Sequence, residues 1–209
     1  SLHQRKNLSC GEGGIVISKK KSVSQKIYKL RSFGAKELSY NYRMTEFSAA
    51  IGRERLKILD NENKIRNEKA NYIFHNTKNI EEFSFIKPSE NCYSSFHKLI
   101  LKINNNKKIK LKNFLNYMKR KGIQFEKTYP PLNTHSNFNP KEKIARGTPW
   151  KWKLYKNSNK LPVSLNKINF PISHNLSLYR LAQIDIDSTV GSTKIHKLIN
   201  SLKNFLIKN

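Results

Sequence analysis

The stretch that decides the fold is residues 1–18, Ser1-Leu-His-Gln-Arg-Lys6-Asn-Leu-Ser-Cys-Gly11-Glu-Gly-Gly14-Ile-Val-Ile-Ser18. A single lysine there precedes a glycine-rich turn, and the β-branched run Ile15–Ile17 follows it. We assign a structural role to Gly11, Gly13 and Gly14, because glycine lets a chain turn sharply and pack closely. The pattern predicts a lysine on a tight turn in front of a short buried strand.

A second block, Glu37-Leu-Ser-Tyr-Asn41-Tyr-Arg43-Met-Thr-Glu-Phe-Ser-Ala-Ala-Ile-Gly52, follows at the distance that one strand and one helix occupy. Between the blocks, Val23, Ile27 and Leu30 fall at helical spacing, and the helix is expected to end near Gly34. The chain therefore begins as strand followed by helix.

A long helix is predicted from Thr45 to about Phe74. Thr45 is a suitable N-cap, because its hydroxyl accepts a hydrogen bond from a main-chain N–H of the first turn. Apolar residues recur on one face and basic residues lie largely on the other: Ala49, Ala50, Leu56, Leu59 and Ile65 against Arg53, Lys57, Lys64 and Lys69. A helix of roughly thirty residues spans about 45 Å, which suits an element that links two domains.

After Pro88 the pattern changes to that of a second, α/β domain. Residues 96–103 alternate as a strand does, residues 111–118 carry a helical apolar face closed by Gly122, and residues 123–125 resume a strand. Residues 129–150 are rich in proline and aromatic side chains, which predicts a long ordered loop. Residues 195–206 are predicted to close the chain as an amphipathic helix.

Length and composition indicate a soluble, cytoplasmic protein with one large or two small domains. The 209 residues are enough to bury a core, no apolar run is long enough to span a membrane, and no charged-then-apolar leader begins the sequence. Cys10 and Cys92 are far apart and outside any CxxC or Cys/His cluster. They argue against a disulfide framework or a metal site and fit a reducing compartment.

The formal net charge of +27 raises nucleic acid as a partner. Only nine of the 41 basic residues are Arg, however, and the rest are Lys scattered among Asn and Ile, a mixture that an adenine- and thymine-rich coding sequence produces without selection for a ligand. The sequence has no RNP-like motif, zinc finger or basic zipper. A specific nucleic-acid binder is therefore only an alternative, while a positive field also suits attraction of a phosphate cofactor or a diphosphate-linked sugar.

The two blocks, HQRKNLSCGEGG and SYNYRM, resemble the DegT/DnrJ/EryC1/StrS family of pyridoxal-phosphate-dependent sugar aminotransferases. The resemblance implies an α/β fold, the C-terminal part of a fold-type I aminotransferase, because about as much chain again precedes this lysine in the family. Residues 1–60 are then the end of the large cofactor-binding domain with the start of the long helix, and residues 61–209 the small α/β domain. Residues 178–193 have no counterpart in the resemblance. The acidic partner of the pyridinium nitrogen, the stacking aromatic and the first phosphate loop belong to the other half.

The resemblance assigns roles to residues of both blocks. Lys6 carries pyridoxal 5'-phosphate as a Schiff base, and its amine shuttles a proton once the donor amino acid has displaced it. Ser1 stands where the family has a serine that contacts the cofactor phosphate. Asn41, with Arg43 beside it, reaches the cofactor of the partner subunit in a homodimer with shared sites, although Ser39 replaces the usual Gly. The alternative is that Asn41 caps local structure and Arg43 is a surface residue.

The substrate side is implied by the segment YPPLNTH, which contains Tyr129 and His135. His135 and His3 are interpreted as hydrogen-bonding scaffolds rather than as an acid or base. Trp150 and Trp152 are candidates for a sugar or nucleotide platform, with loop anchoring as the alternative.

The resemblance predicts an enzyme that transfers an amino group from glutamate or glutamine to a keto-sugar, usually nucleotide-linked, in polysaccharide or secondary-metabolite sugar biosynthesis. The cofactor is pyridoxal phosphate, and no specific nucleic acid and no membrane partner are expected. The 209-residue chain alone is expected to be inactive. Alternatives from other classes are a non-catalytic interaction module left from a truncated gene and a basic nucleic-acid binder.

Overall fold

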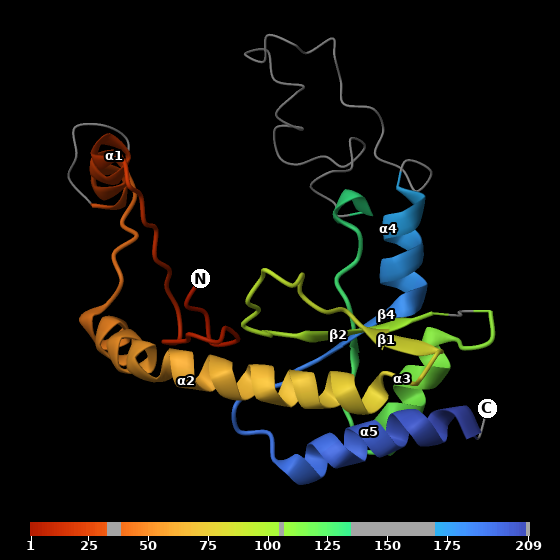
Figure 1. Ribbon diagram of the computed structural model, residues 1–209. Coiled ribbons are helices and arrows are strands. Elements are labelled where there is room, and N and C mark those ends of the chain that lie inside the picture. The colour runs from red at the N-terminus through yellow and green to blue at the C-terminus, as the bar shows by residue number, and fades with distance from the viewer. Residues whose placement is uncertain (33–38, 105–106, 135–169, 208–209) are drawn as a thin grey trace, which may run out of the picture. The chain divides into compact units, whose positions relative to one another are not determined.

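The computed structural model describes residues 1–32, 39–104, 107–134 and 170–207 (Figure 1). The chain divides into two compact units. Unit 1 holds Ser1–Lys69 with the short segments Ser94–His97 and Asp187–Thr189, and unit 2 holds the remainder. The division falls within one long helix, between residues 69 and 70.

Unit 1 contains helix α1, Lys21–Arg31, and the first part of helix α2, Glu46–Thr77. The Thr45 hydroxyl accepts a hydrogen bond from the Ser48 N–H at 3.2 Å, which is the N-cap that the sequence predicts. The 32-residue helix α2 confirms the long helix, and α1 confirms the helix between the two motif blocks. No side chain of α1 is buried.

The prediction of a short buried strand at Ile15–Ile17 is wrong for this chain. The side chains of Ile15, Val16 and Ile17 are 64%, 71% and 90% exposed, and the segment has no strand pairing among the described residues. A strand needs a neighbouring strand to satisfy its N–H and C=O groups and a covering layer to bury its side chains. The described part of unit 1 supplies neither at this segment.

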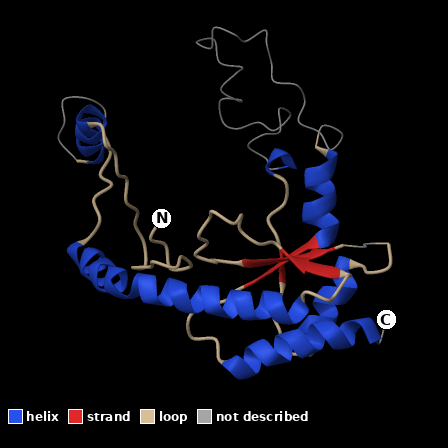
Figure 2. Cartoon of the chain, viewed as in Figure 1, coloured by secondary structure: helices blue, strands red, loops and turns tan. Residues whose placement is uncertain are grey.

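Unit 2 contains a four-stranded antiparallel sheet in the order β1-β2-β4-β3. Its strands are drawn in red in Figure 2. Strand β1 is Phe83–Phe85, β2 is Leu99–Ile103, β3 is Glu126–Lys127 and β4 is Leu181–Ile184. Phe83 pairs with Ile103, and Leu99 pairs with Ile184. The predicted strand, helix, strand unit is present as β2, helix α3 (Leu111–Arg120) and β3, with β4 between its two strands.

Helices α3 and α5, Ser192–Ile207, pack on this sheet through aromatic side chains. The ring of Phe114 on α3 lies 5.2 Å from Phe83 on β1 and 5.6 Å from Phe205 on α5. Gly122, with φ +69°, ends α3 as the sequence predicts, and the Ile123 N–H donates back to the Met118 carbonyl at 2.9 Å. Helix α5 confirms the predicted C-terminal helix.

Three boundaries differ from the sequence analysis. Strand β2 begins at Leu99 rather than at Phe96, whose φ of 41° lies outside the extended region. The strand expected at 123–125 forms pairs only at Glu126–Lys127. Strand β4 lies within residues 178–193, for which the sequence analysis predicts no strand. It is preceded by a short helix α4, Pro171–Asn175, and by a π-helical turn, Leu176–Arg180. In the described part of the chain, no helix is long and apolar enough to cross a membrane.

Candidate functional site

Lys6 lies on a tight, internally hydrogen-bonded loop at the start of unit 1. The Lys6 N–H donates to the His3 carbonyl at 2.9 Å. Leu2 closes the loop twice, because its N–H donates to the Gly13 carbonyl at 2.9 Å and its carbonyl accepts from the Cys10 N–H at 3.0 Å. Leu2 and Cys10 are buried while Lys6 is exposed. The loop thus has a small apolar centre and presents the lysine amine at its surface.

Two glycines shape the loop and join it to the second motif block. Gly11 and Gly13 have φ values of +91° and +137°, a region that side-chain-bearing residues rarely adopt. A Cβ at Gly13 would overlap Cε of Met44, which belongs to SYNYRM. The two blocks therefore meet at Gly13, as the structural role assigned to the glycines requires.

An open groove of about 950 Å³ in unit 1 is lined in part by Ser1, Tyr28, Arg31, Tyr40 and Tyr42. The rings of Tyr40 and Tyr42 stack 4.7 Å apart and 4° from parallel, and the Arg31 guanidinium lies 4.9 Å from the Tyr28 ring centroid. Of the predicted site residues, Ser1 lines this groove, as do the two tyrosines that flank Asn41.

The other residues predicted in unit 1 make local contacts. Arg43 Nε donates to Asn41 Oδ1 at 2.9 Å, and both side chains are exposed. The Ser1 hydroxyl accepts from the His3 N–H at 3.4 Å, and His3 Nε2 lies 3.6 Å from Glu12 Oε1. His3 is therefore part of the loop's own hydrogen bonding. The predicted roles of these residues toward a phosphate stay predictions.

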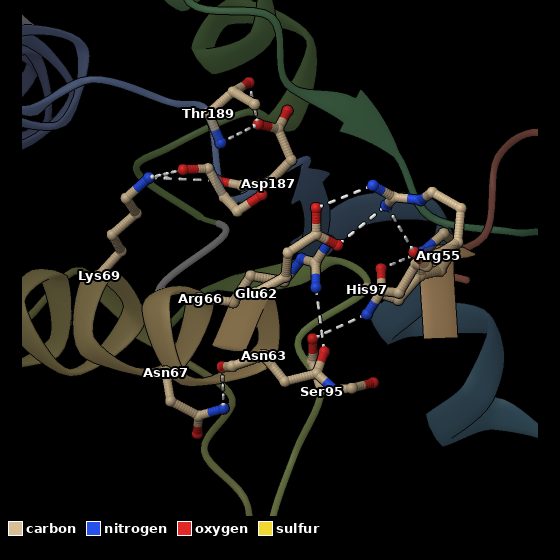
Figure 3. Close-up of polar contacts among 12 residues, drawn as sticks. Arg55, Glu62, Asn63, Arg66, Asn67, Lys69, Ser95, His97, Asp187 and Thr189 are labelled. Atoms are coloured by element: carbon tan, nitrogen blue, oxygen red, sulfur yellow. Dashed lines mark hydrogen bonds and ion pairs between the residues drawn. The ribbon is translucent and has the colours of Figure 1, made fainter. Parts of the chain in front are cut away.

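A cluster of charged residues on α2, which the sequence analysis did not single out, contacts the lysine loop through Arg55. Figure 3 shows the Glu62 carboxylate between the guanidinium groups of Arg55 and Arg66. Arg55 binds Glu62 at 3.1 and 2.9 Å, and Arg66, buried, donates to Asn63 Oδ1 at 3.0 Å and lies 3.5 Å from Glu62. The i,i+4 spacing of Glu62 and Arg66 was the available signal, but it does not reveal the contact with the lysine loop.

Arg55 joins this cluster to the loop. Its Nη2 donates to the main-chain carbonyl of Asn7, the residue after Lys6, at 3.4 Å. The Asn7 side chain in turn donates to the carbonyl of Ser95 at 2.9 Å, and its Oδ1 lies 3.4 Å from His97 Nδ1. Residues far apart in sequence thus meet beside Lys6.

The predicted substrate-side residues belong to unit 2. Tyr129 is 83% exposed, and its main-chain carbonyl accepts a hydrogen bond from the Ser177 hydroxyl. His135, Trp150 and Trp152 lie outside the described residues. Their roles stay predictions.

The arrangement around Lys6 suits covalent capture of a carbonyl compound. An exposed primary amine lies on a loop whose main chain is hydrogen-bonded at several points, and the exposed Ser1 hydroxyl belongs to the same loop. Among the described residues, no group of His, Cys, Asp and Glu is arranged to hold a metal ion.

Comparison with known proteins gives a family and a fold. The model of the DegT/DnrJ/EryC1/StrS aminotransferase family matches residues 1–167. The UDP-4-amino-4,6-dideoxy-N-acetyl-beta-L-altrosamine transaminase of Campylobacter jejuni is 35% identical over 107 residues, which are 46% of this chain and 28% of that protein.

Two solved structures illustrate the fold. The aminotransferase PseC of Helicobacter pylori, involved in the biosynthesis of pseudoaminic acid, aligns with a TM-score of 0.73 at 18% identity over 100% of this chain and 53% of its own. DesV of S. venezuelae, solved in complex with a ketimine intermediate, aligns with a TM-score of 0.78 at 16% identity over 100% of this chain and 51% of its own. The predicted α/β aminotransferase fold is confirmed, and the chain spans about half the length of these two structures.

Proposed function

This chain belongs to the DegT/DnrJ/EryC1/StrS aminotransferase family, and from that premise we propose that it is the C-terminal part of a pyridoxal-phosphate-dependent enzyme that aminates a keto-sugar. The observation that carries the proposal is the setting of Lys6. Its amine is exposed on a hydrogen-bonded loop that contacts the SYNYRM block through Gly13 and Met44. A reacting lysine requires such a fixed main chain and an open approach.

The groups near Lys6 fit a phosphate-bearing aldehyde. Lys6 would hold the aldehyde carbon through a C=N bond, formed with loss of water, and the Ser1 hydroxyl would be a donor for a phosphate oxygen. Because Arg43 occupies Oδ1 of Asn41, the Asn41 Nδ2 donors are left to face an anion. When bound, pyridoxal phosphate supplies an electron sink for the substrate carbon. Lys6 Nζ, freed by the donor amine, would carry the proton between the substrate carbon and the cofactor carbon.

For the substrate we propose a nucleotide-linked keto-sugar, and for the donor glutamate or glutamine. The Campylobacter jejuni relative is a transaminase of a UDP-linked amino sugar, which supports this substrate class. The net charge of +27 supports attraction of a diphosphate group. Tyr129 and His135 are the residues that we assign to the substrate side.

We further propose that the site is completed by chain outside these 209 residues and by a second subunit. The exposed apolar run Ile15–Ile17 supports a need for additional covering chain. If Asn41 serves the partner's cofactor, a full-length Lys6→Ala subunit mixed with an Asn41→Ala subunit regains activity, because one site of the mixed dimer carries neither lesion. Mixed dimers that form and stay inactive, while Asn41→Ala homodimers are impaired, place Asn41 in its own subunit's site.

Covalent trapping tests the central assignment. The native protein is incubated with pyridoxal 5'-phosphate, reduced with borohydride and digested, and the phosphopyridoxyl mass is located by peptide mapping. We expect it on Lys6. Label on other lysines in preference to Lys6 rejects the proposed function.

A further inference from the structure

Asn7, the residue after Lys6, is held by three groups from distant parts of unit 1. Its side-chain Nδ2 donates to the Ser95 carbonyl at 2.9 Å, and its Oδ1 lies 3.4 Å from His97 Nδ1. Its main-chain carbonyl accepts from Arg55 Nη2 at 3.4 Å. The internal hydrogen bonds of the loop give it shape, and the contacts of Asn7 fix the loop to the rest of the unit.

The groups that hold Asn7 are themselves fixed. Arg55 is bound through both Nη atoms to the Glu62 carboxylate, and such fork geometry leaves the guanidinium little freedom. Glu62 is only 14% exposed and also lies beside the buried Arg66. Arg55, which donates to the Asn7 carbonyl, is therefore a constrained donor. Figure 3 shows its guanidinium beside the Glu62 carboxylate.

The segment 94–97 has an unusual backbone that directs its groups toward Asn7. Phe96 is 5% exposed and has φ 41°, a left-handed conformation that is rare for a bulky residue. Its N–H donates to the Ser94 hydroxyl at 3.1 Å, and the Ser94 carbonyl accepts from Asn67 on α2 at 2.7 Å. Strained backbone persists where its surroundings determine it, and it often accompanies a functional constraint.

We infer that Asn7 is a positioning residue for Lys6. A lysine side chain has four rotatable bonds, so its amine is placed only as well as its own main chain is placed. The hydrogen bonds of Asn7 fix the peptide that follows Lys6 against α2 and the segment 94–97. The inference rests on the proposed function in taking Lys6 as the reacting amine, whereas the fixing of the loop stands on the contacts alone.

Hydrogen exchange of the whole chain tests the fixing of the loop. The Asn7→Ala variant is compared with Asn61→Ala, which removes an exposed amide from α2. We expect exchange in residues 1–13 to accelerate about tenfold in Asn7→Ala, as expected for one lost hydrogen bond, and to stay unchanged in Asn61→Ala. Equal exchange in the two variants overturns the inference.

Two further variants, Asn7→Asp and Arg55→Lys, decide the test if Asn7→Ala unfolds unit 1. Asn7→Asp preserves size but replaces the donor to Ser95 by an acceptor, and it is expected to accelerate exchange in the same peptide. Arg55→Lys removes the two-point contact with Glu62, and Arg53→Lys is its matched control on the exposed part of α2. Loop exchange that is unchanged in both Asn7→Asp and Arg55→Lys overturns the inference.

Selective labelling tests the effect on the amine. The full-length protein is treated with pyridoxal 5'-phosphate and borohydride, and label on Lys6 is measured relative to the other lysines. We expect the Lys6 share to fall about tenfold in Asn7→Asp and not in Asn61→Ala. An unchanged share overturns the positioning role. Absence of Lys6 label in the unmodified full-length protein rejects the proposed function and with it the positioning role, while the exchange result still decides whether Asn7 fixes the loop.

Discussion

Replacement of Glu62 is the sharpest test of what stabilises unit 1. Glu62 is 14% exposed and lies between Arg55, 34% exposed, and Arg66, 5% exposed. Among the described residues, the Glu62→Ala change leaves the buried Arg66 side chain with only its hydrogen bond to Asn63. The loss is therefore larger than that of a surface ion pair.

The magnitude follows from burial. Removing one partner of a fully buried pair costs about 3 to 5 kcal/mol. Arg66 retains Asn63, and solvent screens Arg55, so we expect a loss of about 2 to 4 kcal/mol in the free energy of opening unit 1. Glu62→Gln keeps the shape and one acceptor, and we expect about half of that loss.

Native-state hydrogen exchange of residues 46–69 measures this free energy locally, which suits a chain of two units. A loss of about 2 to 4 kcal/mol accelerates exchange roughly thirtyfold to several hundredfold. Glu54→Gln is the matched control, because Glu54 pairs with Lys57 at the surface and its loss should leave exchange unchanged. Glu62→Ala exchange equal to that of the control would falsify the assigned stabilising role.

Three further outcomes are expected. Gly13→Ala should destabilise the lysine loop by about 1 to 3 kcal/mol, because φ +137° is strained for alanine and its Cβ meets Met44, whereas Gly14→Ala should stay within about 0.5 kcal/mol in the same exchange measurement. Lys57→Ala should raise the pKa of the Glu54 carboxyl, which the Lys57 hydrogen bond and then the Lys57 charge hold below its ordinary value; NMR titration checks this. The pKa of Glu54 is lower in the folded chain than in the unfolded one, so the Glu54–Lys57 pair stabilises the fold at pH values above the ordinary carboxyl pKa. This stabilisation is lost as the pH falls through the pKa of the folded state. It is small, because Glu54 is fully exposed to solvent. The 209-residue chain alone should show no turnover of a keto-sugar with glutamate or glutamine, and measurable turnover contradicts the proposed need for additional chain.

Local patterns in the sequence predicted helices α1, α2, α3 and α5 and indicated the family. The Thr45 cap, the apolar face that follows it and Gly122 after α3 act through neighbours within a few residues, so they are readable before folding. The blocks around Lys6 and Asn41 are short and specific enough to indicate an aminotransferase, which the family match confirms.

The tertiary structure decided what depends on a distant partner. Ile15–Ile17 has the composition of a buried strand, yet it is exposed, because composition does not state which surface covers it. Residues 181–184 form strand β4, which no pattern in the sequence predicted, because the position of this strand depends on its pairing with β2 and β3. The sequence pattern places Phe96 in a strand, but its backbone has a positive φ, and strand β2 begins only at Leu99.

The same limit applies to the site. Sequence predicts Lys6 as the reacting residue, because a lysine before GEGG is a local motif. It did not predict the hydrogen bonds that join the loop to Arg55 and Ser95, because these contacts of Asn7 link residues 48 and 88 positions apart. Hydrogen bonds of this kind depend on how α2 and the segment 94–97 are brought beside the loop, and only folding brings them there.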